Sequence, residues 1–187
     1  MGKITYGMLI SADGYYEDAN GEIGFSAPDE QAHRLANEHA RDASVFLFGR
    51  KLFEAMEKPW TEAAANQANL PEVEAEFARE YVATPRVVFS DTLTDVPDGV
   101  RLVRRADARA EVERLKRETD GELSLGGGAL AASIVDLIDE FCPFVVPTMV
   151  GGGKKYFPEG VSIPLRLTEH RVFDSGTVFL RYARVIE

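Results

Sequence analysis

The sequence predicts an α/β fold with a mixed, mostly parallel central sheet, helices on both sides and a C-terminal antiparallel hairpin. Three observations support this class. Strand-like and helix-like periodicities alternate along the chain, short apolar runs are bounded by glycine, and two strand-like segments at the end flank a turn. At 187 residues the chain has room for one domain, which we expect to span residues 1–187.

The chain opens with a strand-like segment over residues 3–11. A helix is expected next, capped by Ser26 or Ala27, with Pro28 in its first turn. Apolar side chains recur on one face of that helix at helical spacing. They are Ala32, Leu35, Ala36, His39 and Ala40, so His39 is expected in the core.

The middle of the chain repeats the alternation. The continuous apolar run 44–48 is typical of a central strand buried on both faces. A helix is expected to begin at Arg50 and to end before Pro59, because proline breaks the helical hydrogen-bond ladder. The segments after it are a loop over 66–71, a helix over 72–82 and a buried strand over 86–90.

The last third carries the glycine-rich turns. Asp107 is expected to cap a helix. A strand over 122–125 then runs into Gly126-Gly127-Gly128 and a further helix, and a long apolar strand covers 141–150. The segments 165–173 and 177–185 flank Asp174-Ser175-Gly176 and predict the terminal hairpin.

Composition excludes several classes of function. The formal net charge of −10 argues against nucleic acid as a partner, because a polyanion is bound by clustered Lys and Arg. Cys142 is the only cysteine, so an internal disulfide and a zinc cluster are excluded and no metal site is expected. The N-terminal apolar stretch is too short for a signal or a membrane span, and we expect a cytoplasmic protein.

Three strand ends carry residues suited to an anionic ligand. They are Gly49-Arg50-Lys51, Ser90-Asp91-Thr92 and Gly126-Gly127-Gly128-Ala129. The free N–H groups of a helix's first turn bind anions, and glycine lets a phosphate approach the backbone. Each turn taken singly also fits a tight, close-packed turn. Together, at the carboxyl edge of one sheet, they predict a phosphate-bearing cofactor.

The run Gly151-Gly152-Gly153-Lys154 resembles part of a phosphate-binding P-loop. The glycine expected five residues before Gly153 is replaced by Thr148, and Lys155 stands where a Ser or Thr is needed. The run is therefore not a Walker A motif. We expect it to turn the chain after a strand, and a place beside the cofactor stays open.

A family resemblance covers nearly the whole chain. The segments LISADGYYEDANGEIGFSAPDE, FLFGRKLFEAM, VVFSDTL, LSLGGGALAASIVDLIDEF and VVPTMVGGGKKYF occur in this order. Together they resemble the dihydrofolate reductase-like superfamily, in particular the C-terminal reductase domain of bacterial riboflavin biosynthesis proteins. The resemblance implies a three-layer fold, bound NADPH, hydride transfer to a small pteridine-like or pyrimidine-like substrate, and a homodimer.

The resemblance also implies cofactor-binding residues at matching positions. They are Ala12, Gly49, Arg50, Lys51, Ser90, Gly126, Gly127, Gly128 and Ala129. One position departs from the pattern, because Asp91 stands where NADPH-using relatives often have a basic residue. A carboxylate there would repel a 2′-phosphate, so preference for NADPH rests on Arg50 and Lys51, and NADH stays an alternative.

The proton donor is the least determined part of the site. Dihydrofolate reductase uses a carboxylate on the helix before the Gly-Arg strand, whereas the matching region here holds Glu30 and His33, so folate reduction is not supported. Asp13, before Gly14, is a further candidate, although Asp-Gly is also a common turn pair and Glu30 also suits a helix start. Trp60 is expected in a loop, where it would wall a flat substrate ring or pack in the core.

Three readings of the function follow. The first is an NADPH-dependent reductase of a small heteroaromatic or carbonyl substrate. The second is a domain of the same fold that binds a nucleotide or a flavin-like ligand without chemistry, and the third is a structural dimer. A zinc deaminase is excluded, because the chain has neither an H-x-E nor a P-C-x-x-C pattern.

Overall fold

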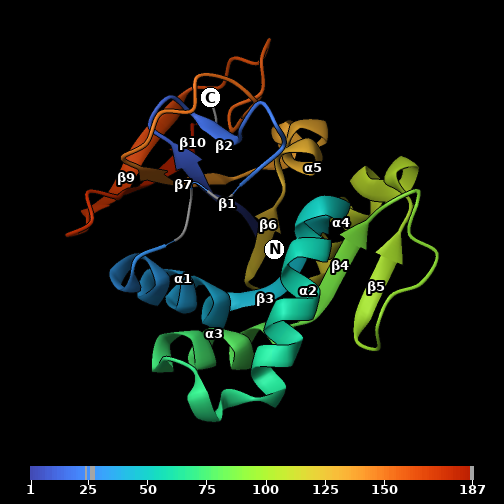
Figure 1. The fold of residues 1–187 in the computed structure, drawn as a ribbon. Helices are drawn as coiled ribbons and strands as arrows, with labels where there is room; N and C mark the ends of the chain where they lie inside the picture. Colours follow the sequence, from blue (N-terminus) through green and yellow to red (C-terminus); the bar gives the residue numbers. More distant parts are fainter. Residues whose placement is uncertain (24, 26–27, 186–187) are drawn as a thin grey trace.

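The computed structural model describes residues 1–23, 25 and 28–185 (Figure 1). The strands are β1 (Lys3–Ser11), β2 (Tyr15–Glu17), β3 (Ala43–Gly49), β4 (Arg86–Phe89), β5 (Val100–Val103), β6 (Glu122–Gly126), β7 (Glu140–Val146), β8 (Lys154–Lys155), β9 (Leu165–Val172) and β10 (Val178–Arg184). The α-helices are α1 (Glu30–Asp42), α2 (Arg50–Ala65), α3 (Glu72–Ala83), α4 (Ala108–Glu118) and α5 (Gly128–Ser133). Short 3-10 turns cover Gln67–Asn69, Arg105–Asp107 and Val135–Leu137.

Eight of these strands form one sheet in the order β5-β4-β3-β6-β1-β7-β10-β9. The strands from β5 to β7 are parallel to their neighbours, and β10 pairs antiparallel with both β7 and β9. The predicted mixed, mostly parallel sheet with a C-terminal hairpin is confirmed. Because the crossover helices return each chain segment to the same side, the carboxyl ends of β3, β4 and β6 lie together.

The two faces of the sheet have separate cores, as the alternation along β3 illustrates. Val45 and Leu47 belong to the cluster that includes buried side chains of α4 and α5, whereas Phe46 and Phe48 pack with buried side chains of α1, α2 and α3. The continuous apolar run of a strand buried on both faces has this origin. Helices therefore cover both faces, with α1–α3 on one side and α4 and α5 on the other (Figure 1).

Two predicted helix boundaries are wrong. Helix α1 is capped by Asp29, whose side chain accepts a hydrogen bond from the Ala32 N–H at 2.8 Å, so Pro28 lies before the cap rather than in the first turn. The predicted caps Ser26 and Ala27 lie outside the described residues. Helix α2 continues through Pro59 to Ala65, because the packing of its second half on α3 outweighs a proline penalty of about 3 kcal/mol.

Other differences concern short or exposed elements. The strands β2, β5 and β8 were not predicted, since two are three residues or fewer and β5 is a half-exposed edge strand. The predicted strand over 141–150 ends at Val146. Asp107 occupies the cap position of α4, but its side chain makes no capping hydrogen bond. In the described part of the chain, no helix is long and apolar enough to cross a membrane.

Candidate active site

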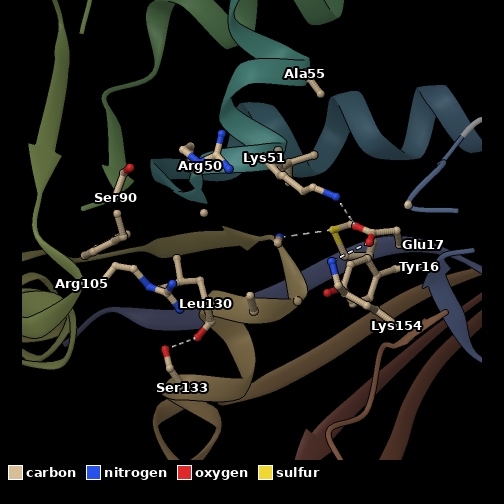
Figure 2. A pocket seen from close by; sticks show the side chains of 18 of the residues that line it. Tyr16, Glu17, Arg50, Lys51, Ala55, Ser90, Arg105, Leu130, Ser133 and Lys154 are labelled. Atoms are coloured by element: carbon tan, nitrogen blue, oxygen red, sulfur yellow. Dashed lines mark hydrogen bonds and ion pairs between the residues drawn. The ribbon is translucent and has the colours of Figure 1, made fainter. Parts of the chain in front are cut away.

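A cavity of about 820 Å³ lies at the carboxyl ends of β3, β4 and β6. Gly49, Ser90 and Gly127 line it at the three strand ends, and Figure 2 shows the side chains around it. Of the predicted cofactor-binding residues, seven line this cavity: Gly49, Arg50, Lys51, Ser90, Gly127, Gly128 and Ala129. The volume falls in the usual range of small-molecule sites.

The amino terminus of α2 opens onto this cavity. Gly49 is its N-cap residue, and no side chain of the described residues caps the first turn. The helix begins with Arg50 and Lys51 and has no acidic residue in its first turn. Cations are unfavourable at a helix N-terminus, where the free N–H groups and the helix dipole already carry positive charge. This arrangement is suited to an anionic ligand.

Close packing explains two of the three glycines after β6. A Cβ at Gly126 would lie 2.5 Å from the Leu52 side chain, and a Cβ at Gly128 would lie 2.1 Å from the Tyr16 ring. Gly127 has φ +101°, and a Cβ there would lie 3.3 Å from the backbone nitrogen of Gly49. The turns that begin α2 and α5 therefore pass close to each other, which places the two predicted phosphate-binding turns side by side.

At one end of the cavity, Ser90 and Asp91 organise the loop after β4. The Ser90 hydroxyl oxygen accepts hydrogen bonds from the N–H groups of Thr92 and Leu93 at 3.2 Å and 3.0 Å. The Asp91 carboxylate accepts a hydrogen bond from the backbone N–H of Arg105 at 2.9 Å. Asp91 thus holds Arg105 at the cavity, a role that the sequence did not indicate.

Arg105 is a basic residue of the cavity that the sequence analysis missed. It follows β5, and without that strand its position at the sheet edge could not be inferred. The other cations that line the cavity have carboxylate partners: Arg50 pairs with Glu54 at 2.9 Å, and Lys51 pairs with Glu17 at 3.2 Å. Within the described residues, the Arg105 guanidinium has no ion pair.

The opposite end of the cavity holds a second set of charges, around Glu17 (Figure 2). The Glu17 carboxylate is buried and pairs with Lys154 Nζ at 2.5 Å and Lys51 Nζ at 3.2 Å. Burial raises the pKa of Glu17, but hydrogen bonds and charge from the two lysines outweigh this and hold the pKa below its ordinary value. Tyr16 lies at this end (Figure 2), and Met8, whose sulfur accepts a hydrogen bond from the Gly127 N–H at 3.4 Å, also lines the cavity.

The cavity lining does not include the predicted proton donors Glu30 and His33 or the predicted substrate residue Trp60. The His33 ring is 5.8 Å from the Trp60 ring and 5.6 Å from the Phe77 ring, in an aromatic cluster between α1, α2 and α3. Burial lowers the pKa of His33. Trp60 is therefore on a helix rather than in a loop, and Glu30 forms an exposed ion pair with Arg34 at 2.6 Å.

Asp13 and Ala12, from the loop after β1, do not line the cavity either. The Asp13 carboxylate accepts hydrogen bonds from the backbone N–H groups of Val150 at 3.2 Å and Gly151 at 2.8 Å. A hydrogen bond with Ser11 and these backbone contacts lower the pKa of Asp13. The side chain thus ties the loop after β1 to the start of the glycine run. Gly126 is also outside the lining, at the end of β6.

The chain belongs to the RibD C-terminal domain family, whose pattern it matches over residues 2–179. A search of curated proteins found no match. Among solved structures, a putative riboflavin biosynthesis protein from Shewanella sp. PV-4 is similar with 23% identity and a TM-score of 0.69, and each chain is covered at 100%.

Three further structures confirm the dihydrofolate reductase-like fold. Dihydrofolate reductase from Enterococcus faecalis, complexed with NADP(H) and RAB-propyl, superposes with a TM-score of 0.66 at 13% identity, covering 98% of this chain and 96% of that one. A second structure is the diaminohydroxyphosphoribosylaminopyrimidine deaminase/5-amino-6-(5-phosphoribosylamino)uracil reductase from Thermotoga maritima. It superposes with a TM-score of 0.66 at 15% identity, with 98% of this chain covered. RibD of Acinetobacter baumannii superposes with a TM-score of 0.67 at 17% identity, with 99% of this chain covered. The chain spans only 57% and 58% of the length of these last two proteins.

Proposed function

We propose that the protein is an NADPH-dependent reductase that transfers a hydride to a small pteridine-like, pyrimidine-like or carbonyl substrate. The observation that carries the proposal is the amino terminus of α2, which no described side chain caps and which begins with two cations at the cavity. A helix start of this kind is stabilised by a bound phosphate.

The residues present fit a nicotinamide dinucleotide phosphate. The backbone at Gly49 and Gly127 would hold phosphate groups where the two turns meet, and Arg50 and Lys51 would add positive charge. Arg105, at the Ser90 end, would bind the 2′-phosphate that distinguishes NADPH from NADH. When bound, the reduced nicotinamide supplies the hydride, and the protein supplies orientation and charge.

Family membership supports the same reaction class. The Thermotoga maritima relative is described as a reductase of 5-amino-6-(5-phosphoribosylamino)uracil, and the Enterococcus faecalis relative is described as a complex with NADP(H). This chain shares their fold. The substrate is the part of the proposal that only an assay can identify.

The reaction is tested by mixing the protein with NADPH and one acceptor at a time. We would use 5-amino-6-(5-phosphoribosylamino)uracil, an oxidised pteridine and the quinone menadione, and follow the loss of reduced nicotinamide absorbance. We expect acceptor-dependent oxidation of NADPH with at least one of them. NADPH binding without oxidation by any acceptor would contradict the reductase and favour a binding domain that has lost its chemistry.

A further inference from the structure

The run Gly151-Gly152-Gly153-Lys154 follows β7 and is not among the residues proposed above to hold the cofactor. It forms β8, which pairs antiparallel with β2 and sets Lys154 opposite Glu17. Gly153 has φ +125°, and a Cβ there would lie 1.9 Å from the carbonyl oxygen of Glu17. Only glycine allows this approach, so the run brings the Lys154 ammonium to the Glu17 carboxylate.

The charges around Glu17 leave a surplus at the cavity. One buried carboxylate, 7% exposed, is shared by two ammonium groups, so the set carries a net charge of about +1. The side chains of Lys51 and Lys154 are 61% and 52% exposed, and both residues line the cavity. A purely structural ion pair between β2 and β8 would need only one cation to balance the Glu17 carboxylate. The second one makes this end of the cavity attractive to developing negative charge.

We propose that Lys154 is the proton donor of the reduction and that Glu17 positions its ammonium group at the cavity. This inference rests on the proposed function, because a reductase of a C=N or C=O bond needs a proton as well as a hydride. The residues predicted as donors from the sequence (Asp13, Glu30 and His33) do not line the cavity.

The proposed reduction adds a hydride and a proton across the C=N or C=O bond of the acceptor. The acceptor carbon would gain the hydride that a bound reduced nicotinamide gives up on oxidation to NADP⁺. One C–H bond of the nicotinamide would break, one C–H bond of the acceptor would form, and the π bond of C=N or C=O would break. Its electron pair moves to the heteroatom, which takes a proton from Lys154 Nζ and leaves a neutral amine. Water then reprotonates the amine of Lys154, because this side chain is half-exposed. Until then, the Lys51 ammonium at 3.2 Å balances the negative charge of Glu17.

Tyr16 is the competing donor, since its side chain lines the same end of the cavity. Burial, and then the charge of Glu17, raise the pKa of Tyr16 to about 12. Proton loss from Tyr16 would place a phenolate beside the Glu17 carboxylate, with like charges in a partly buried site. Lys154 loses a positive charge instead, which creates no repulsion.

Lys155 provides a matched control one residue away. It pairs with the exposed Glu159 at 2.7 Å and does not line the cavity, because successive residues of a strand point to opposite sides. Replacing Lys155 by Met therefore removes the same charge from the same strand and leaves the cavity intact.

The experiment compares Lys154→Met, Lys154→Arg, Tyr16→Phe and Lys155→Met with the unmodified protein. For each we would measure kcat and KM over pH for the acceptor that the unmodified protein reduces, and the affinity for NADP⁺ by calorimetry. We expect Lys154→Met to lose about 100-fold or more in kcat while the NADP⁺ affinity stays within about threefold. Lys154→Arg should be equally slow, because arginine keeps the charge but does not release a proton.

The outcomes separate this inference from the proposed function. Unchanged kcat in Lys154→Met, full activity in Lys154→Arg, or a larger loss in Tyr16→Phe than in Lys154→Met would each overturn the donor role, while the reductase stands. If the unmodified protein reduces none of the three acceptors, the proposed function fails, and the donor role fails with it. Lys155→Met should match the unmodified protein in every measurement.

Discussion

Of the four basic side chains that line the cavity, Arg105 differs from the others in having no carboxylate partner among the described residues. Asp91 holds its backbone N–H at 2.9 Å and so fixes the residue at the Ser90 end. A guanidinium in that position is free to form charge-assisted hydrogen bonds with a phosphate monoester. Asp91, whose carboxylate counted against NADPH in the sequence, thus also positions a cation at the cavity.

Replacing Arg105 by Ala is expected to weaken NADPH binding by about 10-fold to 100-fold, since a hydrogen bond to a charged group contributes about 1.5–3 kcal/mol. NADH, which has no 2′-phosphate, should bind almost as before. Calorimetric titration with both cofactors measures the difference. Arg101→Ala is the control, because Arg101 pairs with Glu111 at 3.3 Å and lies outside the cavity. Equal weakening of NADPH and NADH would place the 2′-phosphate elsewhere.

His39 gives the protein a pH dependence unrelated to the cavity. Its ring packs against the Phe144 and Phe179 rings, and one ring nitrogen lies 2.9 Å from the Arg181 guanidinium. Burial, and then the charge of Arg181, lower the pKa of His39 from 6.5 to about 4. The unfolded chain therefore binds a proton in this window while the folded protein does not, so stability falls as the pH drops from 6.5 toward 4.

Replacing His39 by Gln should remove part of this dependence. We expect the free energy of unfolding of the variant to fall less between pH 7 and pH 5 than that of the unmodified protein, by about 1–2 kcal/mol. Urea unfolding at the two pH values measures it. The pKa of His33 is also lowered, so part of the pH dependence of stability remains in this variant. An unchanged slope in His39→Gln would contradict the role of His39.

The sequence could identify residues next to a strand end but not residues that reach the site through an unrecognised element. Gly49, Ser90 and Gly127 were found because each follows a long apolar strand. Glu17 and Lys154 lie on β2 and β8, whose pairing across 137 residues leaves no local periodicity. Proximity in the fold, rather than residue type, gives these side chains their place.

At the scale of elements, the close approach of the turns that begin α2 and α5 is the feature most sensitive to substitution. Gly127→Ala would force a side chain onto a backbone with φ +101° and bring its Cβ to 3.3 Å from Gly49 N. We expect a loss of about 1–3 kcal/mol in the free energy of unfolding, together with weaker binding of both NADPH and NADH.

Gly152→Ala is the matched control for this prediction. Its nearest neighbour would be 4.0 Å from the new Cβ, and its φ is not positive. Urea unfolding and cofactor titration of the two variants should separate them clearly. Unaltered cofactor affinity in Gly127→Ala would mean that the phosphates do not approach this turn.

The long elements were predictable because their hydrophobic patterns are strong, and the exceptions have local causes. The predicted end of helix α2, before Pro59, was too early. The residues that stabilise the second half of this helix, such as Phe77 on α3, are distant in sequence. The edge strand β5 has too little buried surface for an apolar run. Tertiary packing determines both the end of α2 and the formation of β5, and a local stretch of sequence does not show the contacts involved.

At the scale of the whole molecule, the order of the strands accounts for the position of the cavity. The parallel strands β3, β4 and β6 are neighbours in the sheet and end at the same edge, so turns far apart in sequence converge there. The homodimer implied by the family resemblance stays a prediction. The outer edge of β9, which no described strand covers, is where we would expect a second copy to pair.

NADPH is expected to bind in this cavity at the start of α2, which no described side chain caps. Calorimetric titration of the unmodified protein with NADPH, and separately with NADH, tests it most directly. We expect one site per chain, with NADPH bound at least about tenfold more tightly than NADH, because the 2′-phosphate adds one charge-assisted contact. Absence of binding by both cofactors would contradict the proposed function and the roles of Arg105 and Lys154 together.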